Sequence, residues 1–326
     1  MSANTRVIAI GASAGGTDAL LTIIKRLPAD FPAPVLVALH IGGRFSDLPR
    51  ILGKDSALPV RHAMHGDPIV PGVILVAPPD RHMLVHDSVL HLSRGAKENF
   101  LRPAIDPLFR TLALNQRQKA VGVILSGWLD DGTIGLQAIK AYGGMALVQD
   151  PVDAQVSSMP QNALRYVAVD ACLPIEQLAG YLLEIAQTVP APEVAVGSPA
   201  VEVEGHFDFG TPIDVEDLHK IATPSGFICP ECSGALWEVR AMRPPHFRCH
   251  TGHVFTIDGL AAAHDLMIEE ALWAAIRALH EKGQLIQRFA RTAEAANRHE
   301  SAQEHDATAE VLARHAETLR KMISGT

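Results

Sequence analysis

The chain has 326 residues, of which 48% are hydrophobic and 20% charged, and a formal net charge of -8. The length allows one well-buried domain and a smaller second unit, and the composition is ordinary for a globular protein. The acidic charge argues against nucleic acid as a partner, because the phosphate backbone repels such a surface. No apolar run approaches the roughly 18 residues of a membrane helix, and the N-terminus lacks a signal-peptide core. We therefore expect no membrane insertion. Four cysteines, two of them in a CxxC, do not make a disulfide framework at this length, which favours a reducing, cytoplasmic location.

Residues 1–187 alternate apolar runs of strand length with amphipathic helical stretches. RVIAI leads through GASAGG into TDALLTIIKRL, and AVGVILS leads through GWLDDG into TIGLQAIKAY. This alternation predicts an α/β domain with a doubly wound, mainly parallel sheet. The short runs VILVAPP, RHMLVHD and SVLHLSR have a two-residue period. They predict a β-meander inserted beside that sheet.

The rest of the chain divides into three predicted segments. Residues 188–224 are rich in Pro, Val and Gly without a helical period, which predicts a linker. Residues 225–256 form a compact Cys/His segment. Residues 257–326 are rich in Ala, Leu, Glu and Arg, which predicts a helical hairpin. Its apolar positions fit two alternatives, a hairpin that covers its own apolar face or a surface for a homodimer or another partner.

A glycine-rich turn, Gly11 to Gly16 with the sequence GASAGG, separates the first predicted strand from the first predicted helix. A dinucleotide fingerprint would need glycine in place of Ser13 and an acidic residue where His40 ends the second strand. A second interpretation is a helix N-terminus that Ser13 caps. The third is a GxSxG nucleophile turn that exposes the Ser13 hydroxyl.

Three residue types of a hydrolytic triad each follow a predicted strand. Ser13 follows RVIAI, His40 ends PVLVAL, and Asp131 follows VGVILSG. Because the carboxyl ends of parallel strands share one edge of a sheet, we expect these side chains to meet there. A serine nucleophile, a histidine base and an orienting aspartate form a catalytic unit. Asp130 is the alternative acid.

The same residues lie in blocks that resemble, in order, the CheB-type protein-glutamate methylesterase domain over roughly residues 6–187. The resemblance implies that Ser13 is the nucleophile, His40 the base and Asp131, which precedes a glycine, the acid. It also implies a role in chemotaxis signal transduction, with glutamate methyl esters of chemoreceptor-like proteins as substrate and glutamine deamidation as a second reaction. The blocks are VIAIGASAGGTDALLTIIKRLP, VLVALHI, HGDPIVPGVILVAPPDRHMLV, LRPAIDPLFRTLA, VGVILSGWLDDGTIGLQAIKAYGG and the MP of SSMPQNAL.

Two segments depart from the family pattern. Gly127-Trp128-Leu129 replaces a Gly-Met-Gly-type stretch, and KENFLRP replaces a basic, Asn-containing run. Both changes leave the triad intact and bear on the substrate. The first strand begins at Arg6, so we expect no in-chain receiver domain. An alternative function is a signalling adaptor with weak catalysis, which would bind partners through its C-terminal segments.

The Cys/His segment has the spacing of a zinc ribbon. Cys229-Pro-Glu-Cys232 is followed after sixteen residues by Cys249-His250-Thr251-Gly252-His253. We predict that Cys229, Cys232, Cys249 and His253 bind one zinc ion. His253 is preferred to His250 because CxxxH lets the chain turn back through Gly252. Four protein ligands close the site, so the zinc is expected to be structural and catalysis to need no cofactor.

Overall fold

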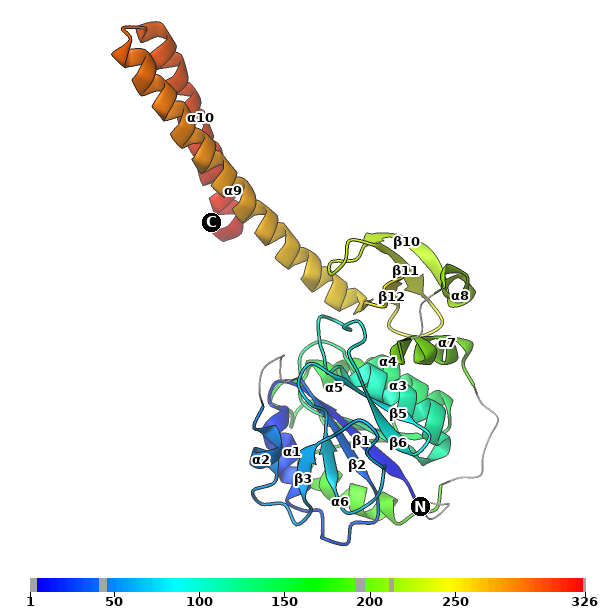
Figure 1. The fold of residues 1–326 in the computed structure, drawn as a ribbon. Helices are drawn as coiled ribbons and strands as arrows, with labels where there is room; N and C mark the ends of the chain where they lie inside the picture. The colour runs from blue at the N-terminus through cyan, green and yellow to red at the C-terminus, as the bar shows by residue number, and fades with distance from the viewer. Residues whose placement is uncertain (1–4, 41–45, 191–196, 211–213, 325–326) are drawn as a thin grey trace. The chain divides into compact units, whose positions relative to one another are not determined.

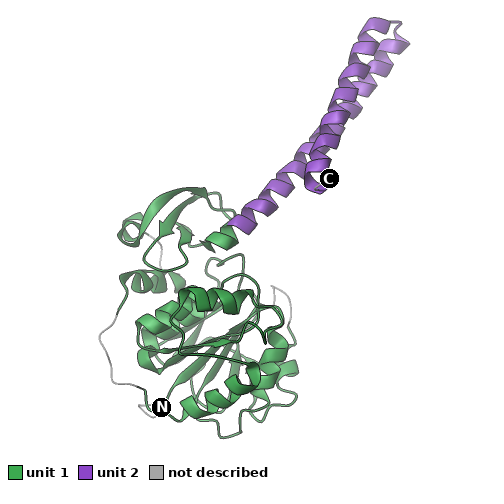
Figure 2. Cartoon of the chain, turned by 180° about the vertical axis from the view of Figure 1, so that it is seen from behind, with its two compact units in different colours: residues 1–260 green, residues 261–326 purple. Residues whose placement is uncertain are grey.

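The computed structural model describes residues 5–40, 46–190, 197–210 and 214–324. The chain forms two compact units, residues 1–260 and residues 261–326 (Figure 2). The first unit contains the predicted α/β domain and the Cys/His segment. The second unit contains most of the predicted helical hairpin, residues 257–326.

A seven-stranded sheet forms the centre of the first unit, in the order β3-β4-β2-β1-β7-β8-β9. Three of its strands, β1, β2 and β3, are labelled in Figure 1. Every strand pair in it is parallel. Each residue of the central strand β1 is buried, which is typical of a parallel sheet covered on both faces. The strands are β1 (Val7–Ala12), β2 (Val35–Leu39), β3 (Val60–His62), β4 (Ile74–Val76), β7 (Ala120–Ile124), β8 (Met145–Gln149) and β9 (Ala171–Leu173).

Helices cover both faces of this sheet, and each face has its own hydrophobic core. One core includes side chains of α1 (Gly16–Ile24), α2 (Leu48–Leu52) and α6 (Ile175–Ala186). The other core includes side chains of three further helices, α3 (Ile105–Gln116), α4 (Thr133–Ala141) and α5 (Ser158–Tyr166). A short 3-10 helix, Arg117–Lys119, joins α3 to β7. The prediction of a doubly wound parallel α/β core is confirmed.

The predicted β-meander is wrong in its first strand. β4 pairs in parallel with β2 and β3 inside the main sheet. Only β5 (His82–His86) and β6 (Val89–Ser93) form an antiparallel pair beside it. All three residues of β4 are buried. A short continuous apolar run is typical of such a strand, so the two-residue period was the wrong pattern to apply there.

The predicted linker, residues 188–224, contains two helices instead of irregular chain alone. They are α7 (Pro199–Asp208) and α8 (Val215–Ile221). Residues 191–196 and 211–213 of that range lie outside the described residues. Proline is favourable in the first turn of a helix, where its missing N–H costs no hydrogen bond. The apolar pattern missed α7 because it buries two carboxylate side chains, Glu204 and Asp208, among small and apolar residues.

Six charged or titratable side chains meet in a buried cluster that joins α3, α7 and β12. The Arg110 guanidinium donates to Glu98 and Asp208, each at 2.6 Å. Glu204 accepts from His246 at 2.7 Å and from Arg248 at 3.1 Å. Burial alone would raise the pKa of Glu204, but the charges of His246, Arg248 and Arg110 outweigh it and lower that pKa. The cluster is Glu98, Arg110, Glu204, Asp208, His246 and Arg248, each with a side chain at most 4% exposed.

Glu204→Gln is expected to lower the free energy of unfolding by about 3 kcal/mol, because it leaves buried cations without their carboxylate. Chemical denaturation followed by circular dichroism measures this change. Glu216→Gln, on the exposed surface of α8, is the matched control and should stay within about 0.5 kcal/mol of the parent. Equal stability of the two variants would contradict a structural role for the cluster.

The Cys/His segment forms a four-stranded antiparallel sheet in the order β10-β11-β12-β13. Its strands are β10 (Ala222–Ile228), β11 (Ala235–Val239), β12 (His246–Cys249) and β13 (Val254–Thr256). We call residues 222–256 the Cys/His module. The helix α9 (Ile257–Ala295) begins at its end, and α10 (His299–Ser324) follows a turn at Asn297. Among the described helices, none combines the length and the apolar character needed to cross a membrane.

Candidate active site and Cys/His cluster

Ser13 lies in the tight turn between β1 and α1. Its amide donates to the Ser126 carbonyl at 2.9 Å, and its own carbonyl accepts from the Gly16 amide at 2.9 Å. Gly15 has a φ of 74°. A Cβ there would lie 2.6 Å from both the Gln155 side-chain oxygen and the Ser126 hydroxyl. The turn therefore requires glycine at this position.

The structure brings Ser13, His40 and Asp131 together at the carboxyl edge of the sheet. His40 Nδ1 lies 2.9 Å from Ser13 Oγ, and His40 Nε2 lies 2.6 Å from Asp131 Oδ2. Ser13 follows β1, His40 follows β2, and Asp131 follows β7. Along the sheet order, the chain runs from β1 to β2 in one direction and from β7 to β8 in the other. Binding and catalytic sites of such sheets lie where the direction reverses, here between β1 and β7. The predicted meeting of these side chains is confirmed.

Asp131 is fixed by two backbone amides at the start of α3. Ile105 donates to Oδ2 at 2.7 Å, and Asp106 donates to Oδ1 at 3.1 Å. Burial alone would raise the pKa of Asp131. The hydrogen bond and charge of His40, together with the two amides, outweigh burial and hold that pKa below its usual value. Asp131 is therefore a buried carboxylate, and helix N-termini are suited to hold one.

The hydrogen-bond chain sets the direction in which a proton can move. An ionised carboxylate only accepts hydrogen bonds, so His40 Nε2 carries the hydrogen that faces Asp131. In the neutral ring, Nδ1 is then the acceptor for the Ser13 hydroxyl. The arrangement can accept a proton from Ser13 and stabilise the charged ring that results.

Asp130, the alternative acid, points to a different partner. Its Oδ1 accepts from the Thr256 hydroxyl at 2.8 Å, and its side chain is buried. Its Oδ2 has no partner among the described residues. Burial raises the pKa of Asp130 to about 7, against the hydrogen bond from Thr256. Of the two neighbouring carboxylates, only Asp131 contacts His40 in the described structure.

Asp130→Asn is expected to stabilise the protein at pH 8 and to have little effect near pH 4. In the wild type the unfolded carboxyl ionises from about pH 4, whereas the folded one keeps its proton until about pH 7. Wild-type stability therefore falls across this window, by up to about 4 kcal/mol from this group alone. Both proteins contain Asp106 and Asp208, so any effect of these carboxyls on the pH dependence of stability cancels in the difference between the two proteins. The unfolding free energy of both proteins, measured from pH 4 to 8, tests this, and a constant difference would contradict it.

Sequence reasoning missed the groups that hold the Ser13 turn and the Asp131 side chain in place. Ser126 is buried, and its hydroxyl donates to the Ala14 carbonyl at 2.7 Å and accepts from the Val156 amide at 2.9 Å. It thereby joins the Ser13 turn to the loop after β8. The amides of Ile105 and Asp106 carry no side-chain signal at all. A polar residue at the end of an apolar strand, such as Ser126, is the one hint that the sequence offered.

An open groove of about 610 Å³ lies beside Ser13 and His40. Ala14 and Gly15 line it, and no hydrogen bond from their amides to another described residue is found. Trp128, in the segment that departs from the family pattern, is 65% exposed. It follows Gly127, where a Cβ would lie 2.8 Å from Ser13 Cβ. An exposed indole therefore lies one residue away from a position in contact with Ser13.

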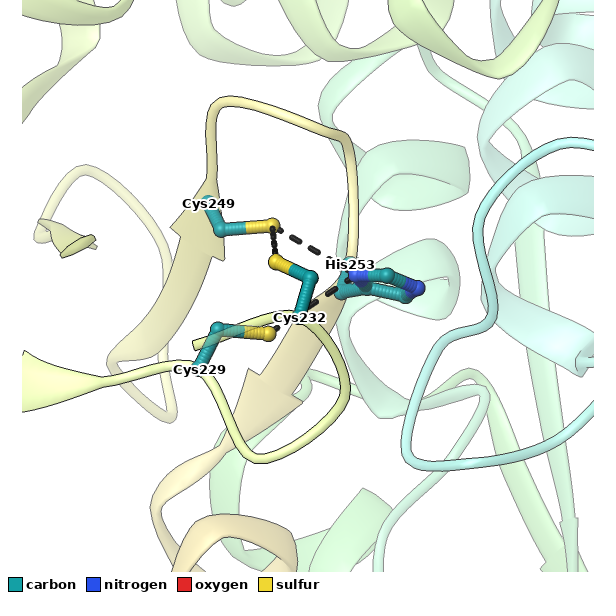
Figure 3. A group of neighbouring side chains, drawn as sticks. All are labelled: Cys229, Cys232, Cys249 and His253. Atoms are coloured by element: carbon teal, nitrogen blue, oxygen red, sulfur yellow. Dashed lines mark hydrogen bonds between the residues drawn. The ribbon is translucent and has the colours of Figure 1, made fainter. Parts of the chain in front are cut away.

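The Cys/His module brings its four predicted ligands together (Figure 3). Two turns present them. The Ser233 amide donates to the Cys229 carbonyl at 2.8 Å, and the Gly252 amide donates to the Cys249 carbonyl at 3.0 Å. The ligand atoms of Cys229, Cys232, Cys249 and His253 all lie within 4.8 Å of one another. His250 is exposed and lies outside this group.

The separations between these atoms fit a tetrahedral metal site. Cys232 Sγ and Cys249 Sγ are 3.7 Å apart, and His253 Nδ1 lies 3.6 Å from Cys249 Sγ and 3.7 Å from Cys229 Sγ. Sulfur ligands about 2.3 Å from a central ion are about 3.8 Å apart at the tetrahedral angle. The other ring nitrogen of His253 lies 3.9 Å from a Glu231 carboxylate oxygen. A carboxylate near the free nitrogen of a metal-bound histidine is a common supporting contact. The cluster can hold a metal ion.

Comparisons with known proteins agree with the α/β domain. The CheB methylesterase family profile matches residues 8–182. A putative protein-glutamate methylesterase/protein-glutamine glutaminase of Leptospira interrogans is 39% identical over 186 residues, which cover 56% of this chain and 96% of that protein. Protein-glutamate methylesterase/protein-glutamine glutaminase 2 of Anaeromyxobacter dehalogenans is also 39% identical, over 185 residues, but the match covers only 54% of that protein.

A solved structure is also similar to the α/β domain. The crystal structure of the Thermotoga maritima CheB methylesterase catalytic domain is similar with a TM-score of 0.54 and 32% sequence identity. The match covers 56% of this chain and 98% of that one. The Cys/His module and the two long helices lie outside the matched family region. Through its α/β domain, the chain belongs to the CheB methylesterase family of protein-glutamate methylesterases.

Proposed function

We propose that the chain hydrolyses glutamate methyl esters of chemoreceptor-like proteins by a serine mechanism. The observation that carries this proposal is the hydrogen-bond chain from Ser13 through His40 to Asp131, with separations of 2.9 and 2.6 Å. Its support is geometric. A nucleophile, a base and a buried carboxylate follow one another at a sheet edge beside an open groove.

In this mechanism His40 Nδ1 takes the hydroxyl proton as Ser13 Oγ attacks the ester carbonyl carbon. The Asp131 carboxylate stabilises the imidazolium that forms. The tetrahedral intermediate collapses, the bond to the methoxy oxygen breaks, and His40 returns the proton so that methanol leaves. Water then attacks the acyl-enzyme, with His40 again as base, which releases the glutamate carboxylate and restores Ser13.

The amides of Ala14 and Gly15 are our candidates for the oxyanion hole. They belong to the turn that begins α1, so the positive end of the helix dipole adds to their effect. Donors of this kind act on the negative charge that develops on the carbonyl oxygen. Their lack of partners among the described residues leaves them free to do so.

The substrate assignment draws on the relatives, whose names describe both methylesterase and glutaminase activity. Glutamine deamidation needs the same acyl-enzyme, with ammonia in place of methanol as the leaving group. The exposed Trp128 and Leu129 add an apolar rim to the turn that bears Asp131. We infer that this rim contacts the receptor near the modified glutamate.

Methanol release from methyl-labelled receptor membranes, with wild-type protein and Ser13→Ala, tests this function. We expect release by the wild type and almost none by the variant. A peptide with one glutamate methyl ester, assayed in parallel, separates chemistry from receptor recognition. No release from either substrate by folded wild-type protein would favour the adaptor function instead. Release by folded Ser13→Ala at the wild-type rate would rule out the serine mechanism.

We further infer that the Cys/His cluster binds zinc in a structural role. Three thiolates and one imidazole are a ligand set that zinc prefers, and four protein ligands leave no open position for substrate. The cluster is formed by residues of the Cys/His module alone, and the proposed triad contributes no ligand to it. When bound, the ion would link the two turns that carry Cys229 and Cys249.

A further inference from the structure

The Cys/His module contacts the α/β domain through backbone hydrogen bonds to the loop before α3. The Asn99 amide donates to the Val254 carbonyl at 2.8 Å, and the Val254 amide donates to the Lys97 carbonyl at 3.3 Å. Glu98 and Val254 thereby form a parallel bridge. The rings of Phe100 and Phe255 pack edge to face, 5.2 Å between centroids. The loop therefore extends the edge of the small sheet at β13.

Thr256, the last residue of β13, joins this contact to the turn that carries Asp131. Its amide donates to Asn99 Oδ1 at 3.0 Å, and its hydroxyl donates to Asp130 Oδ1 at 2.8 Å. The hydroxyl also accepts from the Gly259 amide at 3.1 Å. Thr256 and Asp130 are each 1% exposed. A hydrogen bond this well buried has no water to replace it when it is lost.

Both chain segments that hold Asp131 are thus in contact with the module. Asp130 is the residue directly before Asp131, in a turn bounded by positive φ values at Leu129 (62°) and Gly132 (91°). The second segment is the loop containing Asn99, which leads into Ile105, whose amide binds the Asp131 carboxylate. A shift of β13 would therefore act on Asp131 from two sides.

We propose that Thr256 is a positioning residue for the esterase and that the Cys/His module is part of the working active site. Through Asp130 and Asn99, the module fixes the turn and the loop that hold Asp131, and Asp131 in turn orients His40. This inference rests on the proposed serine mechanism. It assigns a catalytic contribution to a segment outside the matched family region, residues 8–182.

The test compares Thr256→Val with Thr256→Ser in the full-length chain, on a peptide with one glutamate methyl ester. Valine keeps the shape and removes the hydroxyl, whereas serine keeps the hydroxyl. We expect kcat of Thr256→Val to fall about ten- to hundredfold, because small misplacements of a catalytic group have effects of this size. KM should change less than about twofold. Thr256→Ser should restore kcat to within about threefold of the wild type.

A double-mutant cycle with Asp131→Asn separates positioning from general destabilisation. If Thr256 acts through Asp131, the Thr256→Val effect on kcat should shrink to less than about twofold in the Asp131→Asn background. A purely structural role predicts that the two effects multiply. Multiplication of the effects in proteins that remain folded would overturn the proposal.

Gly259→Ala provides an independent perturbation that removes no hydrogen-bonding side chain. A Cβ at Gly259 would lie 2.2 Å from Asn99 Oδ1. We expect the added methyl group to displace the contact and to lower kcat about tenfold. The matched control is Gly283→Ala in the same helix, α9, where a Cβ would meet nothing within 4 Å. If Thr256→Val does not fold, the comparison of Gly259→Ala with Gly283→Ala tests the inference in its place. Equal kcat values of these two variants would reject it.

The outcomes separate the two proposals. Wild-type kcat in folded Thr256→Val, together with an inactive Ser13→Ala, would reject the positioning role alone. Full activity of Ser13→Ala would reject the serine mechanism and, with it, the inference that depends on it.

Discussion

Alanine at Ser13, His40 or Asp131 is expected to lower kcat by about a thousandfold or more. Without Ser13 there is no nucleophile, and without His40 nothing accepts its proton. Asp131→Ala removes the carboxylate that lies 2.6 Å from His40 Nε2, so the ring loses its orientation and the stabilisation of its charged form. Methanol release from an esterified peptide, at saturating substrate, measures each loss.

Combinations of these variants should be far from additive. The three residues act as one unit, so a double or triple variant should lose little more than Ser13→Ala alone. Ser88→Ala, on the exposed turn between β5 and β6, is the matched control and should keep wild-type kcat. Circular dichroism establishes that each variant is folded. Losses that multiply across the series would show that the side chains contribute independently and would contradict a shared mechanism.

A serine-reactive phosphonate gives a readout that does not depend on the substrate. We expect it to label Ser13 in the wild type and much less in His40→Ala, because the hydroxyl is nucleophilic only when the base takes its proton. Peptide mapping locates the label. Labelling of a folded protein at other serines alone would favour the adaptor function.

The meeting of Ser13, His40 and Asp131 was predictable because parallel sheets order their strand ends. Ser13, His40 and Asp131 are far apart in sequence, yet each follows a strand, and β1 pairs with both β2 and β7. Local pattern is enough to place such residues at one edge. It was not enough to choose between Asp130 and Asp131. Adjacent residues in a turn point in different directions, and the positive φ values at Leu129 and Gly132 fix which carboxylate faces His40.

Segments whose environment is made by distant parts of the chain were predicted less well. The sequence of α7 has no apolar helical pattern, because Glu204 and Asp208 lie on its buried side. These carboxylates are buried only because His246, Arg248 and Arg110, from distant parts of the chain, are their partners. β4 is itself a short apolar run, and its place between β2 and β3 depends on pairing across the sheet. The Thr256–Asp130 hydrogen bond spans 126 residues of sequence. No local propensity encodes such contacts, since they exist only after distant parts of the chain have folded together.

Removal of the metal is expected to unfold the Cys/His module. Purified protein should contain one zinc ion per chain, bound by Cys229, Cys232, Cys249 and His253. The module buries only a small apolar cluster of its own, so metal binding, worth about 10 kcal/mol or more in small zinc modules, supplies most of its stability. After chelation, a protease should cut within residues 222–256. Circular dichroism should still report the α/β domain, which has two cores of its own.

Loss of the metal should also lower esterase activity. In the structure, β13 is hydrogen-bonded to Asn99 and Asp130. We therefore expect kcat to fall about as far as in Thr256→Val, about ten- to hundredfold, and to recover when zinc is restored. Cys249→Ser should reproduce the metal-free state. Cys172→Ser is its matched control, because Cys172 is exposed and lies outside the cluster.

Native protein without metal, in which Cys229 and Cys232 react freely with an alkylating reagent, would disprove the zinc assignment. Full activity of a stripped, protease-sensitive protein would keep the zinc and disprove the coupling of the module to Asp131.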